Sequence, residues 1–145
     1  MTIQRHLNLP VHQRTVLVTV DTVRAARGVD ADTILGQVDA GELRWAWDVS
    51  AGKGEVRELR LWAREIIAPE ACAKLTAAAV VSSVIGSDKA RWRGTELAQL
   101  LLVSRPHIKA LADAKELPGQ IAAGTLWVAR AALEKFLTTR LQGQL

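Results

Sequence analysis

The sequence predicts an α+β fold that is mostly α-helical and consists of two similar units joined by a helix. Of the 145 residues, 49% are hydrophobic, which is enough to bury a core. Stretches with the period of an amphipathic helix alternate with stretches of period two. A shift of 74 positions, without gaps, superimposes residues 21–43 on residues 95–117 with six identities. The identical pairs are Val29 and Val103, Ile34 and Ile108, Asp39 and Asp113, Ala40 and Ala114, Glu42 and Glu116, and Leu43 and Leu117.

Residues 15–68 form the first predicted unit. The segment "DTVRAARGVDADTILGQVDAGEL" reads as a helix, a short turn and a second helix, with Asp21 and Asp30 as the expected N-caps. "LRWAWDVS" and "EVRELRLWA" then alternate apolar and polar residues on either side of "AGKG", so we expect a β-hairpin. We interpret Trp45, Trp47 and Trp62 as the core of this hairpin rather than as a platform on which bases stack.

A connecting helix is predicted over residues 69–88. Pro69 suits the first position of a helix, because an N–H group there would have no partner within the helix. The apolar run "PEACAKLTAAAVVSSVI" follows, and Gly86 is the expected stop signal. The β-branched stretch "VVSSVI" leaves open the alternative that this part of the segment is extended.

Residues 89–145 form the second predicted unit, again with two helices, a hairpin and a final helix. Thr95 and Ser104 are the expected N-caps, and Pro106 falls in the first turn of the second helix, where proline favours helix initiation. "GQIAAGTLWVA" predicts a hairpin that turns at Ala123 and Gly124. Matching its "LW" to the "LW" of the first hairpin makes the first hairpin nine residues longer. The final helix is "RAALEKFLTTRL".

The net charge of +4 is unevenly distributed along the chain. An N-terminal arm, residues 1–14, carries two basic groups and no acidic one, whereas residues 15–68 carry seven basic and nine acidic groups. Residues 69–85 carry one of each, and residues 86–145 carry nine basic and five acidic groups. A polyanionic partner is therefore expected to contact the arm and the C-terminal part of the chain.

The stretch from Thr95 to Leu137 resembles the excisionase and MerR-type winged helix-turn-helix family. The resemblance lies in "VSRP" at the start of an Ile-centred helix, then "ELP", a short hairpin that ends in "LWV", and a last helix. The first unit resembles the same family more weakly, through "GVDADTILGQVDAGEL" and "LWAREI". This resemblance implies tandem winged helix-turn-helix units that bind double-stranded DNA. The second helix of a unit would enter the major groove, and the hairpin, or wing, would contact the backbone or the minor groove.

The helical period itself separates two faces of this second helix. Ile108, Leu111 and Ala112 gather on one face, while the opposite face is basic near its N-terminus. The N–H groups there attract a phosphate, and Arg or Lys can read a guanine edge. The predicted DNA-binding residues of the second unit are Arg91, Arg93, Thr95, Ser104, Arg105, Pro106, His107, Lys109, Ala110, Thr125 and Arg130.

The corresponding helix of the first unit departs from this pattern. Its outward positions are Asp32, Leu35, Gly36 and Asp39, with no cation among them, and phosphate repels such a surface. Two alternatives follow: this unit binds DNA through its larger wing, or it is a protein-binding or dimerising module. The candidate DNA-binding residues of the first alternative are Thr33, Arg44, Lys53, Arg57 and Arg60.

Other kinds of chemistry find little support in the sequence. The single cysteine, Cys72, excludes an internal disulfide, and His6, His12 and His107 lie at unrelated spacings, so we expect no metal site. There is no phosphate-binding loop and no nucleophile motif, and we expect neither a cofactor nor enzymatic activity. We also expect no secretory signal, no membrane span and a location in the bacterial cytoplasm, with the nucleoid.

These observations together predict a sequence-specific double-stranded DNA-binding protein. It would act as an excisionase-like recombination directionality or architectural factor, or as a transcriptional regulator of a mobile element. It would bind as a homodimer or a cooperative assembly on DNA. The alternative is an adaptor or antitoxin-like protein, with a first unit that binds an integrase or another protein and a second unit that binds its own promoter.

Overall fold

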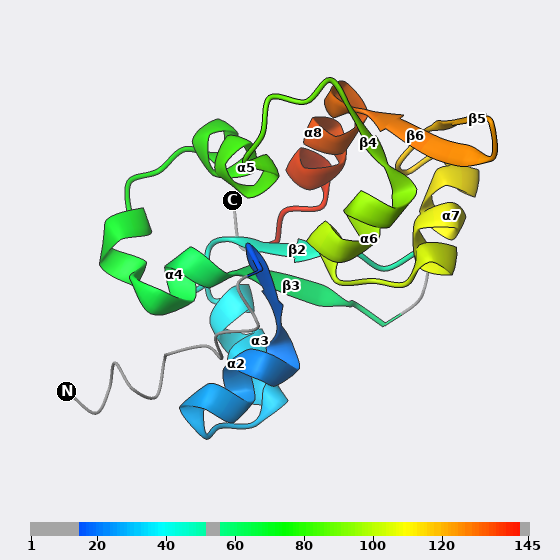
Figure 1. The fold of residues 1–145 in the computed structure, drawn as a ribbon. Helices are drawn as coiled ribbons and strands as arrows, with labels where there is room; N and C mark the ends of the chain where they lie inside the picture. The colour runs from blue at the N-terminus through cyan, green and yellow to red at the C-terminus, as the bar shows by residue number, and fades with distance from the viewer. Residues whose placement is uncertain (1–14, 52–55, 143–145) are drawn as a thin grey trace.

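The computed structural model describes residues 15–51 and 56–142 (Figure 1). The predicted arm 1–14, Lys53 and most of the "AGKG" turn lie outside these residues. About half of the described residues are helical, and the strands form two small antiparallel sheets, so the α+β prediction is confirmed. In chain order the elements are β1 (Leu17–Thr19), α2 (Val20–Arg27), α3 (Ala31–Asp39), β2 (Ala46–Asp48), β3 (Leu59–Trp62), α4 (Ala63–Ile67), the 3₁₀ helix η1 (Pro69–Cys72), α5 (Ala77–Ile85), β4 (Arg91–Arg93), α6 (Gly94–Leu101), α7 (Arg105–Asp113), β5 (Gln120–Ala122), β6 (Thr125–Ala129) and α8 (Arg130–Thr139).

The same order of elements, strand, two helices, hairpin and helix, occurs twice. The two sheets have the equivalent strand orders β1-β3-β2 and β4-β6-β5. The helices α2 and α6 have the same length and lie 74 residues apart, and so do α3 and α7. We refer to β1–α4 as the first unit and to β4–α8 as the second unit. The repeat that the sequence suggests is thus also a repeat of topology.

The two hairpins differ in length by less than the sequence match indicates. Ala63 N donates to Val16 O at the start of α4, and Arg130 N donates to Ala90 O at the start of α8. The two donor residues lie 67 positions apart in the sequence, whereas the two acceptor residues lie 74 positions apart. The difference means that the first hairpin is longer by seven residues, not nine. The two hairpins are aligned correctly by the pairing of β3 with β1 and of β6 with β4. The "LW" dipeptides that the hairpins share do not occupy equivalent positions.

Two of the four predicted N-caps are confirmed. The side chains of Asp30 and Ser104 accept hydrogen bonds from the third backbone N–H groups of α3 and α7. The helices α2 and α6 begin earlier than predicted, because the short strands β1 and β4 run directly into them. Their N-caps are therefore Thr19 and Arg93, and Asp21 and Thr95 lie in the first turns.

The predicted connecting helix is divided in two. Pro69 opens only the short helix η1, which ends in a turn at Ala73 and Lys74. A separate helix, α5, follows, and the Thr76 hydroxyl caps it by accepting from Ala79 N. The β-branched stretch is helical, not extended, because one side of α5 is buried in the core. Gly86 ends α5 in the left-handed conformation, at φ 66°, as predicted.

The sheet of the first unit is buried on both of its faces. One face packs on α2 and α3, and all four residues of β3 are buried. The other face carries Trp45, Trp47 and Trp62, which are at most 3% exposed and share one hydrophobic cluster with α5, α6 and α8. In Figure 1, α2 and α3 lie below this sheet, and α5, α6 and α8 lie above it. The tryptophans are core residues, as predicted, and the core is shared by both units.

Polar contacts also join the units. The Arg60 side chain of β3 is buried and donates to Leu101 O and Leu102 O, both at 2.9 Å, at the turn between α6 and α7. Burial lowers the pKa of the Arg60 guanidinium, and the neighbouring Glu58 carboxylate opposes this shift. At the other end of the interface, Arg140 donates to Asp48 O and Ser50 O at 3.0 and 2.9 Å. Within the described part of the chain, no helix combines the length and the hydropathy that crossing a membrane requires.

Candidate nucleic-acid interface

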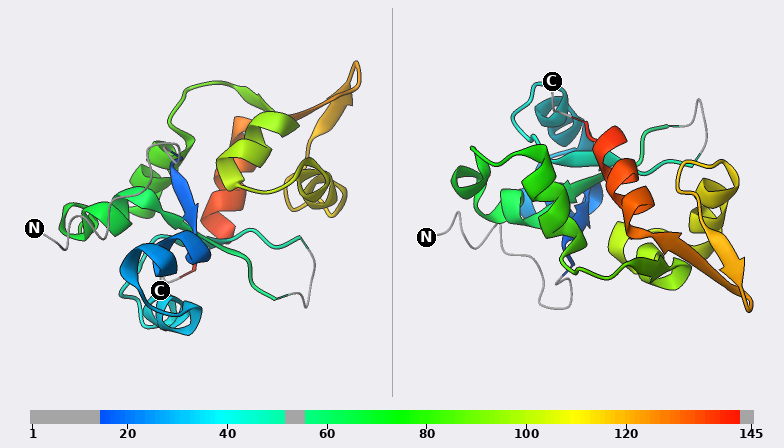
Figure 2. Two further views of the ribbon diagram at one scale, coloured as in Figure 1. Left: turned by 60° about the horizontal axis from the view of Figure 1, so that its bottom comes forward. Right: turned by 90° about the horizontal axis from the view of Figure 1, so that it is seen from above.

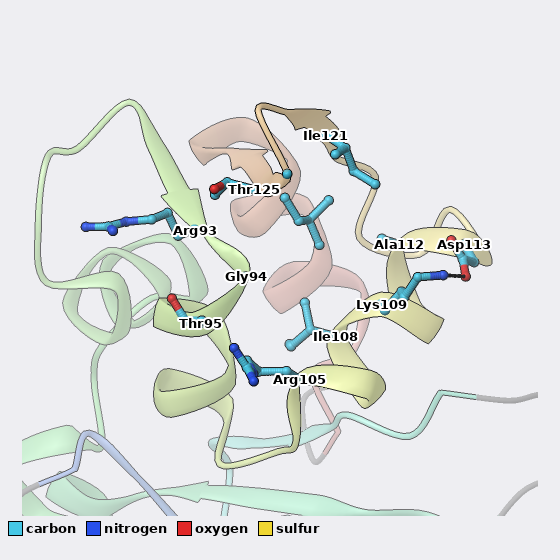
Figure 3. A pocket seen from close by; sticks show the side chains of 12 residues that line it. Arg93, Gly94, Thr95, Arg105, Ile108, Lys109, Ala112, Asp113, Ile121 and Thr125 are labelled. Carbon is cyan, nitrogen blue, oxygen red and sulfur yellow. Dashed lines mark hydrogen bonds and ion pairs between the residues drawn. The ribbon is translucent and has the colours of Figure 1, made fainter.

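A groove of about 440 Å³ lies between α7, the start of α6 and the β5–β6 hairpin (Figure 3). The hairpin projects from the body of the molecule, so it forms a free wall of this groove (Figure 2). Its turn places Ala123 and Gly124 in left-handed conformations, at φ 52° and 79°. The groove is lined by Arg93, Gly94, Thr95, Arg105, Ile108, Lys109, Ala112, Asp113, Ile121, Gly124, Thr125 and Leu126.

Five of the predicted DNA-binding residues meet in this groove. Arg105 and Lys109 come from α7, Arg93 and Thr95 from the junction of β4 and α6, and Thr125 from β6. Because the Ser104 cap fixes where α7 begins, Arg105 becomes its first residue and Lys109 follows one turn later. The groove therefore opens onto two cations at the N-terminal half of an exposed helix.

The charge of Lys109 is only weakly engaged. Its Nζ lies 3.2 Å from Asp113 Oδ2, and the two side chains are 70% and 68% exposed. A surface pair at this helical spacing contributes only about 0.3–0.5 kcal/mol, so a phosphate or a base edge can replace the carboxylate. The described residues provide no carboxylate partner for Arg105. Both cations are thus available to a ligand in the groove.

None of the apolar residues that line the groove is among the predicted DNA-binding residues, although the helical period places Ile108 and Ala112 on one face of α7. Ile108 and Leu126 form its floor, and Gly94 lies so close to them that a Cβ there would be 3.4 Å from Leu126. Ile121, on the hairpin, is 71% exposed. The period-two alternation of β6 contained a signal for Leu126, since it places this residue on the opposite face from Trp127.

Several predicted residues lie outside the groove. Ser104, Pro106 and Ala110 are exposed on and before the first turns of α7. Arg91 lies on β4. Arg130 donates to Ser87 O and pairs with Glu134 at 3.6 Å, so it is tied to α8 and to the segment that precedes β4.

His107 requires a correction. Its side chain is only 19% exposed and faces the first unit instead of the solvent. Its Nε2 lies 2.6 Å from Val49 O, and since a carbonyl oxygen only accepts, Nε2 carries the proton and donates. Glu58 Oε2 lies 3.7 Å from the same nitrogen. His107 therefore anchors α7 to the first hairpin and adds little to the exposed surface.

The candidate residues of the first unit do not form one surface. Arg60 is buried between the units, which corrects the expectation that it contacts DNA. Arg44 donates to Ala73 O and lies over the Trp45 ring, 5.0 Å from its centroid, and Arg57 pairs with Asp39 at 3.0 Å. The Thr33 hydroxyl donates to Asp30, and Lys53 lies outside the described residues.

A smaller groove, of about 320 Å³, occupies the equivalent place in the first unit, with a different lining. Asp21 replaces Thr95 and Leu35 replaces Lys109, after the 74-residue shift, and Glu58 adds a second carboxylate. Its two arginines, Arg57 and Arg60, are engaged in the contacts described above. Among the residues that the structure describes, the repeated scaffold thus carries a basic groove only in its second copy.

Comparison with known proteins identifies no relative: no family model, no curated protein and no solved structure matches this chain.

Proposed function

We propose that this protein binds double-stranded DNA in a sequence-specific manner through its second unit, which acts as a winged helix-turn-helix. In this proposal α7 enters the major groove and the β5–β6 hairpin is the wing. The observation that carries the proposal is the groove in which Arg105 and Lys109 stand exposed beside a projecting hairpin.

The chemistry of the groove suits a nucleic acid. Arg and Lys donate to the O6 and N7 atoms of guanine, and the first turn of a helix offers N–H groups to a phosphate. Pro106 and Ala110 are small and exposed, so they allow α7 to approach the base edges closely. The hydroxyls of Thr95 and Thr125 suit contacts to phosphate or sugar, which position the protein without reading sequence.

For the first unit, the described contacts support a role other than reading DNA. The outer side of α3 exposes Asp32, Gly36 and Asp39, and the base of its hairpin is part of the shared core. We therefore propose that the first unit supports α7 and offers its acidic side to a protein partner. This arrangement is compatible with both biological roles that the sequence predicts, a recombination or architectural factor and a transcriptional regulator of a mobile element. It is also compatible with the adaptor or antitoxin-like alternative.

The test is selection of a binding site from random duplexes, followed by affinity measurements with variants. We expect the double variant Arg105→Ala/Lys109→Ala to lose about 30-fold or more in affinity for the selected site, since each good base contact is worth about 1–3 kcal/mol. The matched control is Arg24→Ala/Arg64→Ala, which removes two exposed cations from the first unit and should leave specific affinity within about threefold. Unchanged specific affinity in the first double variant would show that α7 does not read DNA.

A further inference from the structure

The outer face of the second sheet carries two arginines and a tryptophan in contact. Arg91 and Arg93 lie two positions apart on β4, so both project from the same side of the strand, while Trp92 between them points into the core. Arg93 pairs with Trp127 of β6. The guanidinium carbons of Arg91 and Arg93 lie 4.0 and 6.0 Å from the centroid of the Trp127 ring.

This face adjoins the groove without being part of its floor. In Figure 3 the Arg93 side chain extends away from α7, although its backbone borders the groove. Arg93, at the junction of β4 and α6, belongs both to this face and to the lining of the groove. A ligand as wide as a DNA duplex can therefore contact both.

The two guanidinium groups have few competing partners. Among the described residues, no carboxylate pairs with Arg91, and Arg93 has only Glu96, at 3.7 Å. Glu96 is itself engaged by Lys89 and by the backbone N–H of Arg93, at 2.9 Å from that nitrogen. Arg91 can therefore bind an external anion without giving up a carboxylate, and Arg93 need give up only a long contact with a carboxylate that has other partners.

Stacking on an indole prepares a guanidinium to bind phosphate. A guanidinium that lies flat on an indole ring keeps its N–H donors, which lie at its edge, unobstructed; the 4.0 Å distance of Arg91 fits such a contact, whereas Arg93, at 6.0 Å, is held by a longer cation–π attraction. Contact with the ring also limits the rotamers of a long side chain, so less entropy is lost when the donors bind. Residues two apart on a strand are separated by about 6.6 Å, so the two guanidinium groups lie one after the other along β4.

We propose that this face is a second phosphate-binding surface, on which Trp127 positions Arg91 and Arg93 against neighbouring phosphates of one DNA strand. The proposal rests on the proposed function and deepens it. It adds Trp127 as a positioning residue and assigns to the outer sheet face an affinity that is independent of sequence. The planar guanidinium groups match the spacing of phosphate oxygens. Because this surface borders the groove that we propose for the bases, its ligand is the phosphate backbone of the same duplex.

The test measures affinity for a random-sequence duplex at several salt concentrations between about 50 and 200 mM. We expect Arg91→Ala and Arg93→Ala each to reduce the slope of log affinity against log salt by about 0.9, because each removes one phosphate contact. Trp127→Leu should weaken binding about threefold, and Trp127→Phe, which keeps an aromatic face, should weaken it less. In the Arg91→Ala/Arg93→Ala background, Trp127→Leu should have no further effect.

Arg64→Ala is the matched control. Arg64 is an exposed arginine of the first unit that lies 5.7 Å from the centroid of Trp62, yet it is remote from the groove, so its loss should leave the slope unchanged. Thermal unfolding of each variant identifies any general loss of folding. Trp127→Phe also keeps the test decisive if Trp127→Leu unfolds.

The outcomes separate this inference from the proposed function. A wild-type slope in Arg91→Ala/Arg93→Ala, or an equal effect of Trp127→Leu with and without the two arginines, overturns the inference alone, provided that Arg105→Ala/Lys109→Ala still loses specific affinity. A reduced slope together with unchanged specific affinity in Arg105→Ala/Lys109→Ala supports the phosphate surface and refutes reading by α7. A protein that binds no duplex refutes both.

Discussion

At the scale of single residues, the repeat explains where the backbone is strained. Gly28 and Gly41 have positive φ values of 69° and 80° in the first unit. Their counterparts after the 74-residue shift, Leu102 and Lys115, keep this conformation at 58° and 62°. The left-handed region costs a residue with a Cβ roughly 1–2 kcal/mol, which glycine avoids. The second unit therefore tolerates strain that the first unit does not have.

Lys115→Gly should therefore stabilise the protein. Lys115 is exposed, so removing its side chain loses no packing contacts in the core. We expect a gain of about 1 kcal/mol in the free energy of unfolding. Urea denaturation measures this change. Gly41→Lys is the reciprocal variant and should cost a similar amount. Stabilisation of the same size by Leu102→Gly would contradict the argument, because Leu102 is half-buried and packs on the core.

Glu96 should make stability depend on pH. A hydrogen bond from Lys89, followed by one from the backbone of Arg93, holds the pKa of Glu96 below its ordinary value of 4.5. A carboxyl group whose pKa is lowered by folding stabilises the protein above its unfolded pKa, and this stabilisation is lost as the pH falls through the folded pKa. Glu96→Gln should thus be less stable than the wild type at pH 7 and should converge with it at an acidic pH that lies below the lowered pKa of Glu96. Urea denaturation at both pH values tests this, and a difference that persists in acid would contradict it.

At the scale of elements, Arg60 couples the first hairpin to the α6–α7 turn. Replacing it by methionine keeps most of the apolar stem but leaves Leu101 O and Leu102 O without their donor. We expect a loss of about 3 kcal/mol in stability and faster amide hydrogen exchange in α7. Arg57→Met is the control, since Arg57 lies on the same hairpin but is exposed. Equal effects of the two substitutions would mean that the hairpin, and not the buried guanidinium, holds the turn.

The elements that could be predicted from the sequence are those determined locally. The helices α3 and α7 follow from apolar spacing and from the caps Asp30 and Ser104, and Arg105 and Lys109 of the groove follow from those helices. The strands β1 and β4 are three residues long and exist because β3 and β6 pair with them from far along the chain. The burial of Arg60 likewise depends on contact with the other unit, to which no local pattern points.

At the scale of the whole molecule, the shared core predicts that the two units fold together. Leu17, Trp45, Trp47 and Trp62 of the first unit belong to the same hydrophobic cluster as α5, α6 and α8. Separating the units would expose three buried indole rings and would take the acceptors Leu101 O and Leu102 O away from Arg60. The hydrophobic cost alone would be about 2–3 kcal/mol for each large side chain.

We therefore expect the full chain to unfold in one calorimetric transition, with equal calorimetric and van't Hoff enthalpies. A fragment of residues 87–145 should show no cooperative transition, and it should lose the duplex affinity of the whole protein because α7 loses its anchors at Val49 and Arg60. Scanning calorimetry of the chain and of the fragment makes the comparison.

Two transitions, or a fragment that unfolds at the midpoint temperature of the whole protein, would mean that the first unit is only tethered to the second. One transition would mean that any partner bound by the first unit also acts on the stability of α7, since both belong to one cooperative structure.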